Sequence, residues 1–127
     1  MALRVLVVDD SRIMIKKMTA MLSELGYQVA GTAENGQLAM EEYARLRPDL
    51  VTMDISMPEM DGIESSKLIL SRFPDARIIM VTAMGQQQLV LQAMNLGVAG
   101  YVLKPVEGRK LSAAINNALK RKTSLTW

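Results

Sequence analysis

The sequence predicts an α/β fold in which five parallel strands form one sheet with helices on both faces. Two observations indicate this fold. Short apolar runs recur five times along the 127 residues, and segments with helical spacing of apolar residues separate them. Because strands and helices alternate with short connections, each helix returns the chain to the start of the next strand, and the strands pair in parallel.

The five apolar runs are the predicted strands. The first run, Leu-Arg-Val-Leu-Val-Val, is rich in branched residues, as is typical of a strand that is buried on both faces. The run Ile-Ile-Met-Val at 78–81 has the same character. The predicted strands are Leu3–Val8, Gln28–Ala33, Leu50–Met53, Arg77–Val81 and Ala99–Leu103.

Apolar stripes at helical spacing mark the predicted helices. Gly26 ends the first helix, and Gly97 ends the fourth. The second helix begins near Asn35-Gly36 and ends before Arg47-Pro48, and the third runs from near Asp61-Gly62 to Phe73-Pro74, because a residue that precedes proline disfavours helix. The stripe residues of the first, fourth and fifth helices are Met14, Met18, Met21, Leu22 and Leu25; Leu89, Val90, Ala93 and Met94; and Leu111, Ala114, Ile115, Ala118 and Leu119. Most of the eleven methionines are predicted to fill the core.

Composition excludes several classes of protein and site. The chain has no cysteine and no histidine, so disulfides, thiolate metal sites, zinc-binding histidines and a histidine general base are excluded. The net charge of +2 gives no electrostatic reason to expect nucleic acid or membrane as a partner. The uncharged stretch at 78–103 is interrupted by glutamines and glycines, and the N-terminus lacks a signal-peptide pattern, so we expect a cytoplasmic protein.

Reactive side chains follow four of the five predicted strands. They are Asp9-Asp10, Asp54, Thr82 and Lys104-Pro105. In open α/β sheets, ligands bind at the carboxyl ends of the strands, so we expect these groups at one edge. Three carboxylates that lie together repel one another unless a cation intervenes, and Mg²⁺ suits oxygen ligands. Such a carboxylate, beside Mg²⁺, a lysine and a hydroxyl, is suited to attack phosphorus, with an outside phosphoryl donor.

Four segments carry a resemblance to a known family. They are Val-Val-Asp-Asp-Ser at 7–11, Met-Asp-Ile-Ser-Met-Pro-Glu-Met-Asp-Gly at 53–62, Val-Thr-Ala at 81–83 and Tyr-Val-Leu-Lys-Pro at 101–105. In order and spacing they resemble the receiver domains of two-component response regulators, and Thr-Ala-Met-Gly-Gln-Gln at 82–87 most resembles the stand-alone chemotaxis regulators of the CheY type. The resemblance implies a flavodoxin-like (βα)5 three-layer sandwich with strand order 2-1-3-4-5, a receiver domain at 1–122 and a short tail at 123–127.

The resemblance implies a role for each acidic residue. Asp54 would accept the phosphoryl group. Asp10, Asp54 and the backbone carbonyl of Ser56 would bind Mg²⁺, and Asp9 would often act through a water molecule. A sensor histidine kinase would supply the phosphoryl group, and the chain would be a monomeric signalling protein with only slow phosphorylation and dephosphorylation of its own rather than an enzyme.

Further roles implied by the resemblance concern the switch. Thr82 and Lys104 would bind the phosphoryl oxygens, Pro105 would follow a cis peptide bond, and Tyr101 would turn inward as Thr82 moves. The helix 4, strand 5 and helix 5 face would then bind a phosphorylation-dependent target, such as the flagellar motor switch. The residues predicted for this face are Gln88, Leu91, Gln92, Tyr101 and Val106.

Two family positions, Ser56 and Met84, would tune the lifetime of the phosphoryl group. Chemotaxis regulators often carry an amide or acidic residue where this chain has Ser56, so the lifetime and a phosphatase partner stay open. Other roles are the receiver half of a transcription regulator or a phosphorelay intermediate. A haloacid-dehalogenase-type phosphatase would need a carboxylate at Ser56, and a flavin carrier would need a Ser/Thr/Gly-rich loop in place of Asp9–Ile13.

Overall fold

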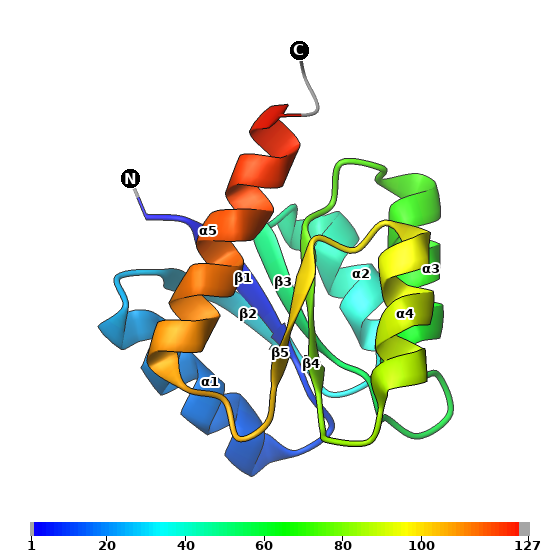
Figure 1. Ribbon diagram of the computed structural model, residues 1–127, viewed down its shortest axis with the longest axis horizontal. Helices are drawn as coiled ribbons and strands as arrows, with labels where there is room; N and C mark the ends of the chain where they lie inside the picture. Colours follow the sequence, from blue (N-terminus) through cyan, green and yellow to red (C-terminus); the bar gives the residue numbers. More distant parts are fainter. Residues whose placement is uncertain (1, 125–127) are drawn as a thin grey trace.

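A five-stranded parallel sheet forms the centre of the molecule, as predicted (Figure 1). The computed structural model describes residues 2–124. The strand order is β2-β1-β3-β4-β5, and all four neighbouring pairs are parallel. The strands are β1 (Arg4–Val8), β2 (Gln28–Ala33), β3 (Leu50–Asp54), β4 (Ile78–Thr82) and β5 (Gly100–Leu103). The helices are α1 (Arg12–Glu24), α2 (Gly36–Leu46), α3 (Gly62–Arg72), α4 (Gln87–Leu96) and α5 (Gly108–Ser124).

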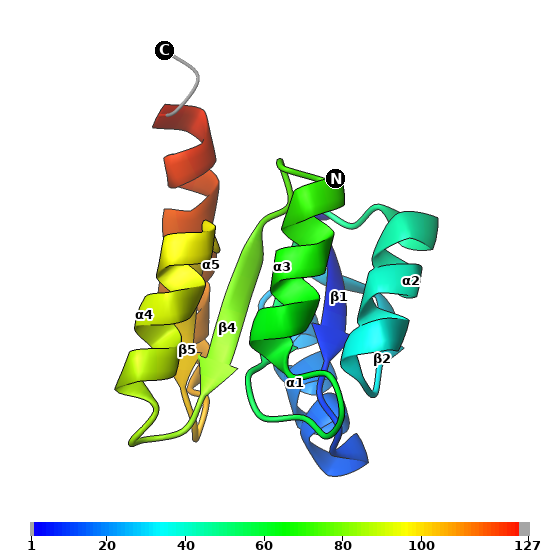
Figure 2. The same ribbon diagram turned by 90° about the vertical axis from the view of Figure 1, so that its right-hand side faces the viewer.

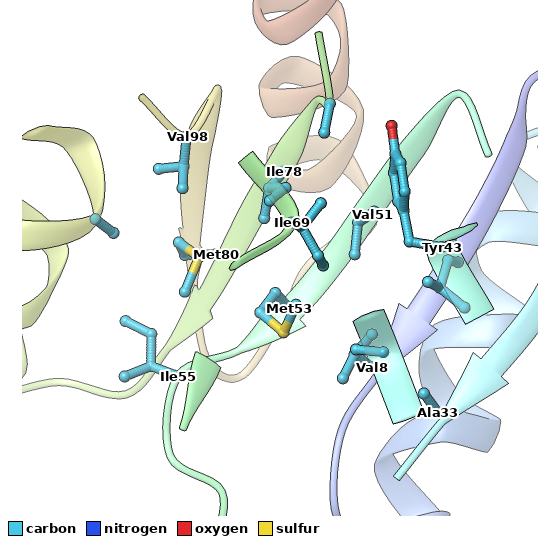
Figure 3. Packing of buried hydrophobic residues seen from close by; sticks show 14 of the residues in the cluster. Val8, Ala33, Tyr43, Val51, Met53, Ile55, Ile69, Ile78, Met80 and Val98 are labelled. Carbon is cyan, nitrogen blue, oxygen red and sulfur yellow. The ribbon is translucent and has the colours of Figure 1, made fainter. Parts of the chain in front are cut away.

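The helices form two layers. α1 and α5 cover one face of the sheet, and α2, α3 and α4 cover the other (Figures 1 and 2). The side chains of β1 alternate between the two faces because successive residues of a strand point in opposite directions. Val5 and Val7 pack with Leu22 and Ile115 under α1 and α5. Leu6 and Val8 point to the opposite face and belong to the second core cluster. In this cluster the side chains of β1, β3 and β4 meet those of α2 and α3 (Figure 3).

Local sequence explains where most of the helices begin. The side chains of Ser11, Asn35 and Asp61 each accept a hydrogen bond from a backbone N–H in the first turn of α1, α2 and α3. Such N-caps satisfy amide groups that have no partner within the helix. α4 differs, because its N-cap residue is Gln86 and makes no side-chain capping bond. α4 ends at Gly97, whose φ of 102° places it in the left-handed region that glycine adopts without strain.

Two strands extend one residue further than the sequence predicted. β3 ends at Asp54 rather than Met53, and β4 ends at Thr82 rather than Val81. The pairing continues because Asp54 pairs with Val81 across the sheet and the Lys104 N–H donates to the Thr82 carbonyl at 2.7 Å. Two predicted site residues are therefore held by the sheet rather than by loops.

The predictions for the methionines and for the C-terminal tail are only partly confirmed by the structure. Met18, Met53, Met57 and Met80 are buried as predicted, but Met84 is 84% exposed. The predicted tail at 123–127 lies partly outside the described residues, and α5 continues to Ser124. Within the part of the chain that the structure describes, no helix is both long and apolar enough to cross a membrane.

Candidate functional site

Three carboxylates meet at the carboxyl ends of two neighbouring strands. Asp9 and Asp10 follow β1, and Asp54 is the last residue of β3, which pairs directly with β1. One carboxylate oxygen from each of the three lies within 4.8 Å of the others. Asp9 and Asp54 are buried, with 6% and 4% of their surface exposed, whereas Asp10 is exposed. The sequence prediction that these acids share one edge is therefore correct in its geometry.

Lys104 supplies the positive charge of the site. Its Nζ lies 3.0 Å from Asp54 Oδ1 and 3.8 Å from Asp9 Oδ2. The lysine directly follows β5, and its backbone N–H bonds to the end of β4, which aims the side chain across the ends of β4 and β3. The peptide bond between Lys104 and Pro105 is cis.

Burial raises the pKa of Asp54 to about 6, well above its ordinary value of 3.8. The hydrogen bond and attraction from Lys104 lower the pKa of Asp54, but burial and the neighbouring charges of Asp9 and Asp10 outweigh them. The pKa of Asp9 is also raised, first by burial, although the Ser11 N–H donates to its carboxylate at 2.9 Å. The site therefore holds more negative charge than one lysine stabilises.

The donor set fits a hard divalent cation. Three carboxylates carry three negative charges when ionised, and Lys104 returns only one positive charge to the cluster. Carboxylate oxygens are the ligands that Mg²⁺ binds, commonly one or two together with waters. The exposed side of the cluster at Asp10 leaves an approach from solvent for a cation and an anionic group.

The loop that follows Asp54 lies close against the strand. The Gly62 N–H donates to the Ile55 carbonyl at 2.8 Å, and a β-carbon at Gly62 would collide with the Asp54 carbonyl oxygen. Glycine is required there because the start of α3 packs against the backbone of the acidic residue. This contact fixes the position of Asp54 from the C-terminal side.

Thr82 lies at the end of β4, next to the strand that carries Asp54, and its side chain is fully buried. Its hydroxyl donates to the side-chain carbonyl of Gln86 at 2.7 Å. The same glutamine oxygen accepts from the Ala83 N–H at 2.7 Å, and the Gln86 amide donates to the Ser56 hydroxyl at 2.7 Å. Gln86 therefore links two of the predicted site residues, Thr82 and Ser56.

Gln86 was not among the residues predicted for the site. In the sequence it is one of the glutamines that interrupt an apolar stretch and part of the segment at 82–87. A glutamine just before a helix has no local signal for this role, since its contact with Ser56 crosses from one strand end to another, 30 residues apart. Only the neighbouring positions of β3 and β4 in the sheet bring the two side chains together.

An open groove of about 430 Å³ lies between α4 and β5. Met84, Leu91 and Tyr101 line it, with 84%, 63% and 49% of their surface exposed, and Thr82 and Gln86 form its end near the acidic cluster. Of the other residues predicted for the partner face, Gln88 and Gln92 are exposed on α4, and Val106 is half-buried and packs against the core cluster under α1 and α5.

Comparison with known proteins extends these observations. The family model described as the response regulator receiver domain matches residues 5–116. Chemotaxis protein CheY of Thermotoga maritima is 43% identical over 120 residues, which cover 94% of this chain and 100% of that protein. Chemotaxis protein CheY of Bacillus subtilis is 45% identical over 119 residues, which cover 94% of this chain and 99% of that protein.

A solved structure is similar along nearly the same length. A chain in the crystal structure of the CheX-CheY-BeF3-Mg+2 complex from Borrelia burgdorferi aligns with a TM-score of 0.88 and 33% identity. The alignment covers 92% of this chain and 89% of that one. Similarity in sequence and in fold therefore extends over the strands that carry the acidic cluster.

Proposed function

Because this chain belongs to the response regulator receiver domain family, we propose that it is a stand-alone regulator that a phosphoryl group on Asp54 switches. The observation that carries this proposal is the buried Asp54 carboxylate, held 3.0 Å from Lys104 at an edge that it shares with Asp9 and Asp10. A buried carboxylate with a cation beside it and an opening to solvent is suited to accept a phosphoryl group.

The proposed phosphoryl transfer uses a small set of residues around Asp54. A carboxylate oxygen of Asp54 attacks phosphorus of a phosphohistidine donor, so that the O–P bond forms while the N–P bond breaks and the imidazole leaves. Lys104 stabilises the charge on the phosphoryl oxygens, and the Thr82 hydroxyl donates to one of them. Asp9, Asp10, Asp54 and the Ser56 carbonyl are the ligands that we assign to Mg²⁺. When bound, the ion neutralises charge on the acids and on the transferring group.

The proposed partners follow from the same reading. The donor is a sensor histidine kinase, and the chain acts as a signalling protein without turnover of a substrate. The α4–β5–α5 face, with Tyr101 as the switch, binds a target such as the flagellar motor switch when Asp54 is phosphorylated. The similarity to two chemotaxis proteins over almost their whole length supports this role over that of a transcription regulator's receiver half.

Phosphorylation by acetyl phosphate tests the proposal. The protein is incubated with acetyl phosphate, with and without Mg²⁺, and its intact mass is measured beside that of Asp54→Asn. We expect one phosphoryl group on the wild type in Mg²⁺ and none on Asp54→Asn. Asp75→Asn, which changes an exposed acid, is the matched control and should be phosphorylated like the wild type. Equal uptake by Asp54→Asn would refute the assignment.

The chemotaxis role needs a second measurement. Binding of the phosphorylated and unphosphorylated protein to a flagellar motor switch protein is compared by calorimetry. We expect tighter binding of the phosphorylated form, and Leu91→Asp, which places a charge in the α4–β5 groove, should weaken it. Equal affinities of the two forms would contradict this role and leave phosphorylation at Asp54 intact.

A further inference from the structure

The side chain of Gln86 forms three hydrogen bonds next to the acidic cluster. Its carbonyl oxygen accepts from the Thr82 hydroxyl and from the Ala83 N–H, both at 2.7 Å. Its amide nitrogen donates to the Ser56 hydroxyl at 2.7 Å. A side-chain amide that is held at both ends is fixed in position, since each neutral hydrogen bond contributes to its stability there.

Gln86 forms these three hydrogen bonds instead of capping the helix that it begins. It is the N-cap residue of α4, yet its side chain makes no bond to the first turn of that helix. In α1, α2 and α3 the N-cap side chains of Ser11, Asn35 and Asp61 do make that bond. The start of α4 is therefore tied to the end of β4 through Gln86 rather than closed on itself.

The two donors that Gln86 occupies are suited to an anion. A hydroxyl and a backbone N–H that point at one oxygen form the kind of paired donor that stabilises negative charge. Thr82 ends the strand beside Asp54, and Ala83 is the next residue. Thr82 is the residue assigned above to a phosphoryl oxygen on Asp54, and in this structure the neutral oxygen of Gln86 accepts from both Thr82 and Ala83.

We propose that Gln86 is a latch that keeps the regulator in its unphosphorylated conformation by occupying the Thr82 and Ala83 donors. A phosphoryl group on Asp54 replaces the Gln86 oxygen at these donors, because a charged acceptor binds them more strongly than a neutral amide. The released side chain loses its bond to Ser56, which frees the start of α4. Gln86 also lines the α4–β5 groove with Gln87 and Tyr101, so its release reshapes the surface where a target binds.

The latch rests on the proposed function, but its test measures a separate quantity. Beryllium trifluoride with Mg²⁺, an analogue of the phosphoryl group, is titrated into the wild type and Gln86→Met, and binding is followed by amide NMR. Methionine has a similar length and cannot form the three bonds. We expect Gln86→Met to bind the analogue about threefold to tenfold more tightly, since two donors are freed in advance.

Amide hydrogen exchange in the absence of the analogue gives a second readout. The Ala83 N–H of Gln86→Met should exchange faster than that of the wild type, because its acceptor is gone. Ser56→Ala changes an exposed side chain and removes one bond of the latch, so it should tighten binding of the analogue by a smaller factor. Gln87→Met, at the next and exposed position, is the control and should behave like the wild type in both measurements.

The outcomes separate the two proposals. If the wild type binds the analogue and Gln86→Met binds it equally or more weakly, with Ala83 exchange unchanged, the latch is refuted while the receiver function stands. If Gln87→Met matches Gln86→Met in affinity and exchange, the effect is not specific to the Gln86 bonds and the latch is also refuted. If the wild type neither binds the analogue nor takes up phosphate from acetyl phosphate, the proposed function itself fails.

Discussion

Replacing Asp54 by asparagine should stabilise the metal-free protein at neutral pH. The folded state raises the pKa of Asp54 from 3.8 to about 6, so the folded protein binds a proton more tightly than the unfolded chain does. The stabilisation from that proton is complete below about pH 4 and is lost as the pH rises through about 6. Above this window, the ionised carboxylate destabilises the folded state, because it is buried beside Asp9 and Asp10.

The pKa difference sets the magnitude. The two values differ by about 2 pH units, and each unit corresponds to about 1.4 kcal/mol, so ionised Asp54 costs at most about 3 kcal/mol. Asparagine has nearly the same shape and can still accept from Lys104, but it carries no charge. We therefore expect Asp54→Asn to raise the free energy of unfolding by about 1 to 3 kcal/mol at about pH 7.5, and by much less at about pH 4.

Urea unfolding in EDTA, at several pH values from about 4 to 8, measures this effect. A gain of about 2 kcal/mol should move the urea midpoint by about 1 M. Addition of Mg²⁺ should stabilise the wild type more than the mutant, because the mutant lacks one of the three carboxylates. The control Asp75→Asn should show no comparable pH-dependent gain. A mutant that is no more stable than the wild type at neutral pH, or a gain that does not change with pH, would refute this reasoning.

Three further predictions concern single contacts. Lys104→Met should remove the cation 3.0 Å from Asp54, raise the pKa of that carboxyl further and slow phosphorylation by acetyl phosphate at least tenfold, as measured by intact mass; an unchanged rate would contradict its role. Gly62→Ala should cost about 1 to 3 kcal/mol in urea unfolding, because its β-carbon meets the Asp54 carbonyl, whereas Gly100→Ala, where no atom lies within 4 Å of the added carbon, is the control. Leu22→Ala should cost about 2 to 5 kcal/mol by leaving a cavity between α1 and the sheet, and a loss below about 1 kcal/mol would contradict this by showing that the surrounding side chains fill the space.

The sequence was most informative about the elements of the fold. The branched run of β1 and the proline and glycine residues at helix ends are local signals, so the order of strands and helices could be predicted from the residues alone. The ends of β3 and β4 were placed one residue short. A strand end depends on the length of the neighbouring strand, and pairing to Val81 and Lys104 carries the ladder on to Asp54 and Thr82.

The candidate site was predictable in its members but not in its contacts. Asp9, Asp10, Asp54 and Lys104 could be chosen because the carboxyl ends of parallel strands meet at one edge. Which carboxylate Lys104 approaches, and that burial raises the pKa of Asp54, depend on the order of the strands and on what covers them. The sequence implied that order only through a family resemblance.

The sequence by itself determined the α/β fold and the reactive residue types at the strand ends, because both follow from patterns within a few residues. The tertiary structure alone decided that Gln86 joins Thr82 to Ser56, since the two strand ends that carry them are adjacent only in the folded sheet. Hydrogen bonds and charge interactions act over a few ångströms in space. The distances between strand ends depend on the order of the strands in the sheet, so local sequence patterns do not predict them.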